Sequence, residues 1–234
     1  MIARYPTFFI AIAVLLGCGG KPVETPVPPA AATPAAPPTM SGVPEDTVPT
    51  IVFLGTSLTA GYGLPDPRLA YPTLIQAKLD SAGLKFRTVN AGVSGETSAG
   101  ALRRIEWVLD QGRIAVLMIE TGANDGLRGQ DPDSTRANIQ AIIAKARLLD
   151  PAPKIILTGM EAMPNLGADF TRRFRGIFPE LARTTGAALV PFLLEGVAGV
   201  DSLNQADGIH PTPRGQQIVA ATVWKVLAPL LARR

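Results

Sequence analysis

The chain contains a single histidine, His210, and Asp207 lies three residues before it. Gly208 and Pro211 break this segment, so the imidazole and the carboxylate can turn toward each other from one loop. A serine becomes a nucleophile when a histidine accepts its proton and a carboxylate orients that histidine. Ser57 is the best-placed hydroxyl, because it directly follows an apolar segment that predicts a strand. The three residues together predict acyl transfer by a serine nucleophile.

Acyl transfer also needs hydrogen-bond donors aimed at the oxyanion of the tetrahedral intermediate, each worth about 3 to 4 kcal/mol. The candidate donors are the backbone N–H groups of Ser57 and Gly95 and the side-chain amide of Asn124. Taken singly, these residues have simpler interpretations as a helix-capping serine, a turn glycine and a turn asparagine. Ser94 is a rival nucleophile, because it also lies in a loop after a predicted strand.

The elements that must position these residues alternate between short apolar runs and longer periodic segments. Nearly continuous apolar or β-branched runs predict strands over residues 50–55, 86–90, 114–120, 154–158 and 187–191. Helical patterns predict helices over residues 71–82, 97–111, 132–150, 169–184 and 213–232. This alternation predicts one doubly wound three-layer domain around a parallel sheet, with ligands beyond the carboxyl ends of the strands.

The candidate residues occur in four polar segments, and three of these directly follow a predicted strand. The segments are residues 55–58, 91–97, 121–126 and 207–211. Since the carboxyl ends of parallel strands lie along one edge of a sheet, the segments are expected to converge on one rim.

These segments, in this order, resemble the SGNH, or GDSL, hydrolase superfamily, and most of all its bacterial thioesterase I, lysophospholipase and arylesterase branch. The similarity runs over about residues 51–226 and rests on the stretches 53–63, 90–97, 122–129 and 207–211. It implies that Ser57 is the nucleophile, that Asp207 and His210 are the acid and base, and that Gly95 and Asn124 serve the oxyanion.

The resemblance implies a flavodoxin-like three-layer α/β/α sandwich with a central five-stranded parallel sheet. One residue departs from the pattern, because Thr56 stands where the family's Gly-Asp-Ser-Leu motif has its aspartate. That aspartate is not the triad acid, so the departure concerns the hydrogen bonds that hold the nucleophile loop.

The implied function is a serine esterase that hydrolyses carboxylic esters or thioesters through an acyl-enzyme on Ser57, without a metal or an organic cofactor. An aryl or medium-chain ester, a lysophospholipid and an acyl thioester all fit as substrates. The segment after the fourth strand resembles the branch's substrate-facing loop, where Met160, Met163 and Pro164 are candidate acyl contacts. The two methionines fit the core equally well. The alternatives are a carbohydrate or peptidoglycan O-acetyl esterase and a catalytically silent surface lipoprotein.

The N-terminal segment has the features of an export signal. An apolar run over residues 8–17 follows Arg4 and is too short to span a bilayer comfortably, as in a secretory signal. Cys18, the only cysteine, ends a stretch that resembles the lipobox of bacterial lipoproteins, which implies lipidation at this residue. An ordinary unpaired cysteine after a cleaved signal is the alternative.

The sequence therefore predicts three regions. Residues 1–17 are a signal peptide of the lipoprotein type, residues 18–49 are a lipidated cysteine and a Pro/Ala-rich tether, and residues 50–234 are the hydrolase domain. We expect an exported protein that is lipid-anchored to a bacterial membrane, in the periplasm or at the cell surface.

Composition excludes several other classes of function. The net charge is only +3 and the basic residues form no cluster, which argues against nucleic acid as a partner. One cysteine excludes an intramolecular disulfide and a cysteine-based zinc site, and one histidine excludes an imidazole-rich metal site.

Overall fold

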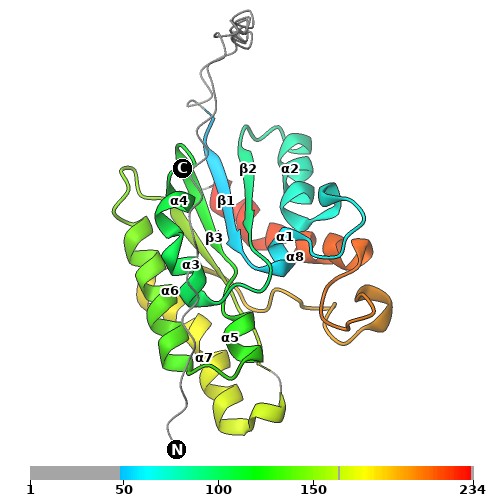
Figure 1. Cartoon of the computed structure of the whole chain (residues 1–234). Coiled ribbons are helices and arrows are strands. Elements are labelled where there is room, and N and C mark those ends of the chain that lie inside the picture. The colour runs from blue at the N-terminus through cyan, green and yellow to red at the C-terminus, as the bar shows by residue number, and fades with distance from the viewer. Residues whose placement is uncertain (1–47, 163, 233–234) are drawn as a thin grey trace, which may run out of the picture. The chain divides into compact units, whose positions relative to one another are not determined.

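Five parallel strands form one sheet in the computed structural model of the protein, which describes residues 48–162 and 164–232 (Figure 1). The strands are β1 (Thr50–Gly55), β2 (Arg87–Gly92), β3 (Ile114–Ile119), β4 (Lys154–Thr158) and β5 (Ala188–Val190). Their order in the sheet is β2-β1-β3-β4-β5, and every neighbouring pair is parallel. The chain changes direction across the sheet between β1 and β3, which is where ligands bind in doubly wound folds. The predicted fold class is confirmed.

Helices cover both faces of the sheet, as Figure 1 shows. The longer helices are α2 (Tyr71–Ser81), α6 (Pro132–Ala146), α7 (Ala168–Thr185) and α8 (Pro213–Ala232). The shorter ones are α1 (Ser57–Ala60), α3 (Ser98–Arg103), α4 (Ile105–Leu109), α5 (Ala123–Leu127), η2 (Pro67–Leu69), η3 (Pro164–Leu166) and η4 (Asp201–Leu203). Helix α2 packs with α8 on one face, while α6 packs with α3, α4 and α7 on the other.

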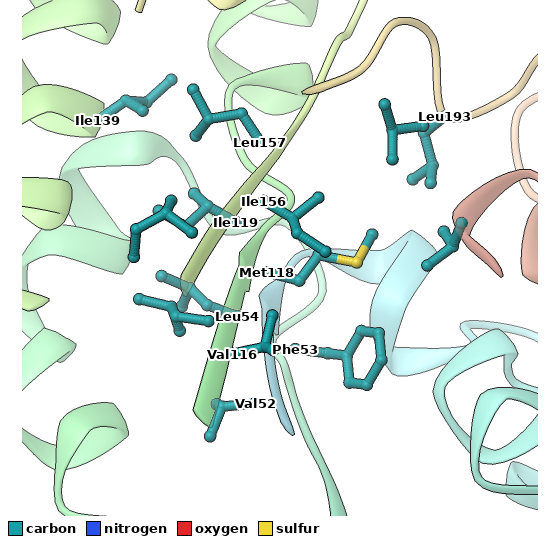
Figure 2. Close-up of a cluster of buried hydrophobic side chains, with 14 of the residues drawn as sticks. Val52, Phe53, Leu54, Val116, Met118, Ile119, Ile139, Ile156, Leu157 and Leu193 are labelled. Carbon is teal, nitrogen blue, oxygen red and sulfur yellow. The ribbon is translucent and has the colours of Figure 1, made fainter. Parts of the chain in front are cut away.

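The central strands are buried on both faces, which explains their continuous apolar sequences. All six residues of β1 are buried. Figure 2 shows Phe53 and Met118 pointing to one side of the sheet and Leu54 and Ile119 to the other, as the strand period of two requires. The ring of Phe53 packs edge-on against Tyr71 of α2, with centroids 5.6 Å apart. This two-sided core fixes the strands whose ends carry the site.

One predicted helix differs from the structure. The segment over residues 97–111 is broken into α3 and α4 at Arg104, whose φ of −103° and ψ of 8° are not helical. The Arg104 guanidinium turns inward and donates to the carbonyl oxygens of Gly55 and Ala91, at the ends of β1 and β2. These contacts across the sheet are not encoded in the helical pattern, so periodicity alone did not predict the break.

Other boundaries shift by a few residues. Strand β2 extends to Gly92, β3 ends one residue before Glu120, and α6 ends at Ala146. No helix in the described ranges is long and apolar enough to cross a bilayer. The predicted signal peptide, Cys18 and most of the tether lie outside the described residues.

Candidate active site

Ser57, His210 and Asp207 form one continuous chain of hydrogen-bonded side chains. His210 Nε2 lies 2.8 Å from Ser57 Oγ, and His210 Nδ1 lies 2.7 Å from Asp207 Oδ2. The His210 side chain is 17% exposed and that of Asp207 38%, so solvent reaches both of them. The structure therefore brings together the three residues that the sequence singled out.

Asp207 occupies a tight turn that fixes it relative to His210. Its Oδ1 atom accepts the backbone N–H groups of Ile209 at 2.9 Å and His210 at 3.0 Å, and Gly208 adopts a φ of 71° between them. These N–H groups and the imidazole lower the pKa of Asp207 to about 2, with the His210 N–H contributing most. The ionised carboxylate accepts only, so Nδ1 carries the proton and Nε2 accepts from Ser57.

Ser57 begins α1 and is separated from the end of β1 by Thr56 alone, at the edge where the chain changes direction across the sheet. Its backbone N–H is in the first turn of a helix and therefore has no acceptor within that helix. Helix α1 packs closely against the end of β2 at Gly92. A Cβ atom at Gly92 would lie 2.3 Å from the Ala60 nitrogen and 2.9 Å from the Thr56 oxygen. Glycine at this position thus allows the approach that places Ser57.

Gly95 and Asn124 line the same cavity as Ser57, which has a volume of about 690 Å³. Gly95 has a φ of 77°, a conformation that favours glycine. The side-chain amide of Asn124 donates one hydrogen to the backbone carbonyl oxygen of Glu96 at 3.0 Å, and this bond orients the amide. The second hydrogen of the amide remains for a substrate. Ser94 also lines the cavity, but it is the Ser57 hydroxyl that donates a hydrogen bond to the imidazole of His210.

Three acidic residues support these loops, and none was singled out from the sequence. Glu120 and Asp125 are buried and Glu96 is largely buried. Glu96 pairs with Arg104 at 2.7 Å, and both side chains are largely buried. Asp125 accepts the backbone N–H of Ser98 at 2.8 Å and its hydroxyl at 2.5 Å. Glu120 lies beneath the nucleophile turn, and burial raises its pKa to about 7 against the opposing effect of its hydrogen bonds. The sequence signal that could have revealed Glu120 is an acidic residue at the end of an otherwise apolar run.

Of the three residues predicted to contact the acyl group, the structure places one in the cavity. Met160 lines the cavity and is 3% exposed. Met163 lies outside the described residues, and Pro164 begins η3 with a side chain that is not described. The sequence reasoning missed Tyr62, whose ring lies over His210 with centroids 4.8 Å apart. Further apolar side chains line the cavity, namely Leu58, Leu127, Phe192, Leu194 and Ile209.

Comparison with known proteins shows which family has this sequence and fold. Residues 53–218 match the model of the GDSL-like lipase/acylhydrolase family. Esterase TesA of Pseudomonas aeruginosa is 40% identical over 182 residues, covering 78% of this chain and 89% of the relative. Thioesterase 1/protease 1/lysophospholipase L1 of Escherichia coli is 34% identical over 182 residues, covering 78% and 85%.

A solved structure shows the same fold. The crystal structure of TesA superposes with a TM-score of 0.73 at 39% sequence identity, over 77% of this chain and 99% of that one. The resemblance seen in the four sequence segments is thereby confirmed. The chain belongs to the GDSL-like lipase/acylhydrolase family.

Proposed function

We propose that Ser57, His210 and Asp207 are the catalytic triad of a carboxylic ester hydrolase that works through an acyl-enzyme on Ser57. The observation that carries this proposal is the chain of two short hydrogen bonds from Asp207 through His210 to Ser57 Oγ. The family and the names of the relatives, an esterase and a thioesterase/lysophospholipase, support the same reaction class.

The first half-reaction forms the acyl-enzyme. As Ser57 Oγ bonds to the carbonyl carbon, its proton passes to His210 Nε2, and Asp207 stabilises the imidazolium. The N–H groups of Ser57 and Gly95 and the free amide hydrogen of Asn124 stabilise the oxyanion. The intermediate then collapses, and the leaving alcohol or thiol takes the proton from His210.

The second half-reaction releases the acid. A water molecule gives its proton to His210 Nε2 as its oxygen attacks the acyl carbon on Ser57. Collapse of the second intermediate breaks the bond to Ser57 Oγ, which recovers a proton from His210. The resting site is restored.

The lining of the cavity favours substrates with an apolar acyl or aryl group. Its side chains are mostly apolar, and Tyr62, Leu127 and Ile209 are also exposed at its surface. A sugar O-acetyl ester would need polar and aromatic platforms. Among the described residues that line the cavity, Tyr62 and Phe192 are the aromatic side chains, which is few for such a platform. We therefore favour aryl esters, acyl esters and thioesters, including lysophospholipids, over acetylated carbohydrates.

We also propose that the protein is exported and anchored to a bacterial membrane through lipid on Cys18. The support is the apolar run that ends at this single cysteine and the Pro/Ala-rich stretch that follows it. A membrane location would supply lysophospholipids, and export would make acyl-CoA a scarce substrate.

Hydrolysis of p-nitrophenyl esters from acetate to palmitate tests the proposed function. We expect a rate maximum at medium or long chains that disappears in Ser57→Ala and persists in the matched variant Ser94→Ala. Activity confined to acetate would favour a deacetylase. Absence of Ser57-dependent hydrolysis at every chain length would contradict the proposal and favour a silent lipoprotein.

A further inference from the structure

Glu120 is a fully buried acidic residue that no step of the reaction uses. It directly follows β3, is 0% exposed, and accepts hydrogen bonds on both of its oxygens. Thr56 donates its backbone N–H at 2.7 Å and its hydroxyl at 2.9 Å. Thr59 donates its hydroxyl at 2.8 Å and its backbone N–H at 3.3 Å. These hydrogen bonds fix the position of the buried carboxylate, and the carboxylate in turn fixes the positions of Thr56 and Thr59.

The donors come from the two residues that flank Ser57 on the inner side of the turn. Thr56 precedes the serine and Thr59 lies two residues after it, so both point inward on one helical face while Ser57 points to the cavity. Gly55 leaves the room that this requires. A Cβ atom at Gly55 would lie 1.9 Å from Thr59 Oγ1 and 2.7 Å from Glu120 Oε2.

The hydrogens in this network all run toward Glu120. Thr59 has one hydroxyl hydrogen, which Glu120 accepts, so the Tyr71 hydroxyl at 2.7 Å must donate to Thr59. Tyr71 is itself fully buried. Above its pKa of about 7, Glu120 is ionised and completes this pattern with every hydrogen paired. Loss of one donor then leaves a charged acceptor partly unsatisfied.

Thr56 is also where the chain departs from its family's Gly-Asp-Ser-Leu motif. An aspartate there would place a second carboxyl group beside Glu120, and one of the two would have to hold a proton. The threonine instead supplies a hydroxyl donor. In this chain, residue 56 therefore meets Glu120 as a hydrogen-bond donor.

We propose that Glu120 is a positioning residue for the nucleophile, because its carboxylate acts through Thr56 and Thr59 to aim the Ser57 hydroxyl and N–H group into the cavity. This inference rests on the proposed role of Ser57. A positioning role for Glu120 differs from a purely structural role in one measurable respect. Weakening its hydrogen bonds should slow the reaction at Ser57 more than it weakens substrate binding.

The test compares Thr56→Val, which keeps the shape and loses the hydroxyl, with Thr56→Ser, which keeps the hydroxyl. We expect Thr56→Val to lower kcat about tenfold or more while KM stays within about twofold, and Thr56→Ser to stay near wild type. The rate of Ser57 labelling by a fluorophosphonate should fall in parallel with kcat. Glu120→Gln should lower both rates further, with Glu106→Gln on α4, which is exposed, as the charge-matched control.

Equal kcat values for folded Thr56→Val and Thr56→Ser would overturn the proposal, as would normal turnover in Glu120→Gln. If Glu120→Gln fails to fold, the Thr56 pair decides, with thermal unfolding showing that both are folded. Wild-type protein without Ser57-dependent hydrolysis would instead overturn the proposed function, and this inference with it.

Discussion

Asp207 shows how local chemistry sets the electrostatics of the candidate triad. Two backbone N–H groups and the imidazole surround its carboxylate and hold its pKa near 2. The stability that these contacts add is fully present above the unfolded pKa of about 4 and is lost as the pH falls through about 2. Asp207 is therefore ionised wherever His210 can act as a base.

Asp207→Asn should lower kcat about 10³- to 10⁴-fold without unfolding the protein, because an amide offers His210 the wrong hydrogen-bond partner. Steady-state kinetics on a p-nitrophenyl ester, with circular dichroism as the folding check, would measure this. Asp201→Asn, in the exposed η4, is the matched control and should keep its activity. Near-normal turnover in folded Asp207→Asn would remove this residue from the triad.

At the scale of elements, the ends of β1, β2 and β3 carry the site, and buried polar groups connect them. The sequence predicted the strands because their apolar runs are long and uninterrupted. It predicted His210 because this is the chain's single histidine. Ser57 and Asp207 were predicted from their positions, after a strand and three residues before that histidine, and from the family resemblance. It did not predict the roles of Glu120 or Arg104, since both depend on contacts with residues far away in the chain.

Gly92→Ala tests the close packing of α1 on β2. The added methyl group would collide with the backbone of Ala60, so we expect about 1 to 3 kcal/mol lower stability and reduced kcat. Gly176→Ala in α7 is the matched control, because open space surrounds that position. It should raise stability by about 0.5 to 1 kcal/mol and leave kcat unchanged. Denaturant unfolding measures both, and equal effects would refute the packing argument.

Glu120 should make stability depend on pH. Its carboxyl, with a pKa of 4.5 in the unfolded chain and about 7 in the fold, keeps a proton that the unfolded chain releases between these values. The free energy of unfolding should therefore fall as the pH rises from 4.5 to 7 and level off above 7. Tyr71, the titratable group linked to it through Thr59, has a pKa raised well above 10 by burial and stays neutral throughout.

Urea unfolding of wild type and Glu120→Gln at several pH values checks this effect. The difference between the two proteins should show the slope, since the amide cannot titrate. Parallel stability curves for the two proteins would show that Glu120 does not titrate in this range.

At the scale of the whole molecule, the chain combines a hydrolase domain with an N-terminal segment that we propose directs export. If lipid on Cys18 anchors the protein, Cys18→Ser should move it from the membrane fraction to the soluble exported fraction. Immunoblotting of cell fractions would show this, and esterase activity should remain because Cys18 lies outside the matched region of residues 53–218. Unchanged membrane association would contradict lipidation at this cysteine.

The most direct test of the central claim is the site of covalent labelling by a fluorophosphonate, read by mass spectrometry of the digested protein. A fluorophosphonate forms a stable adduct with a serine that is activated by a base. We predict one adduct per chain, on Ser57, which is lost in His210→Ala. An adduct on Ser94, or an active protein that carries none, would contradict the assignment of the nucleophile.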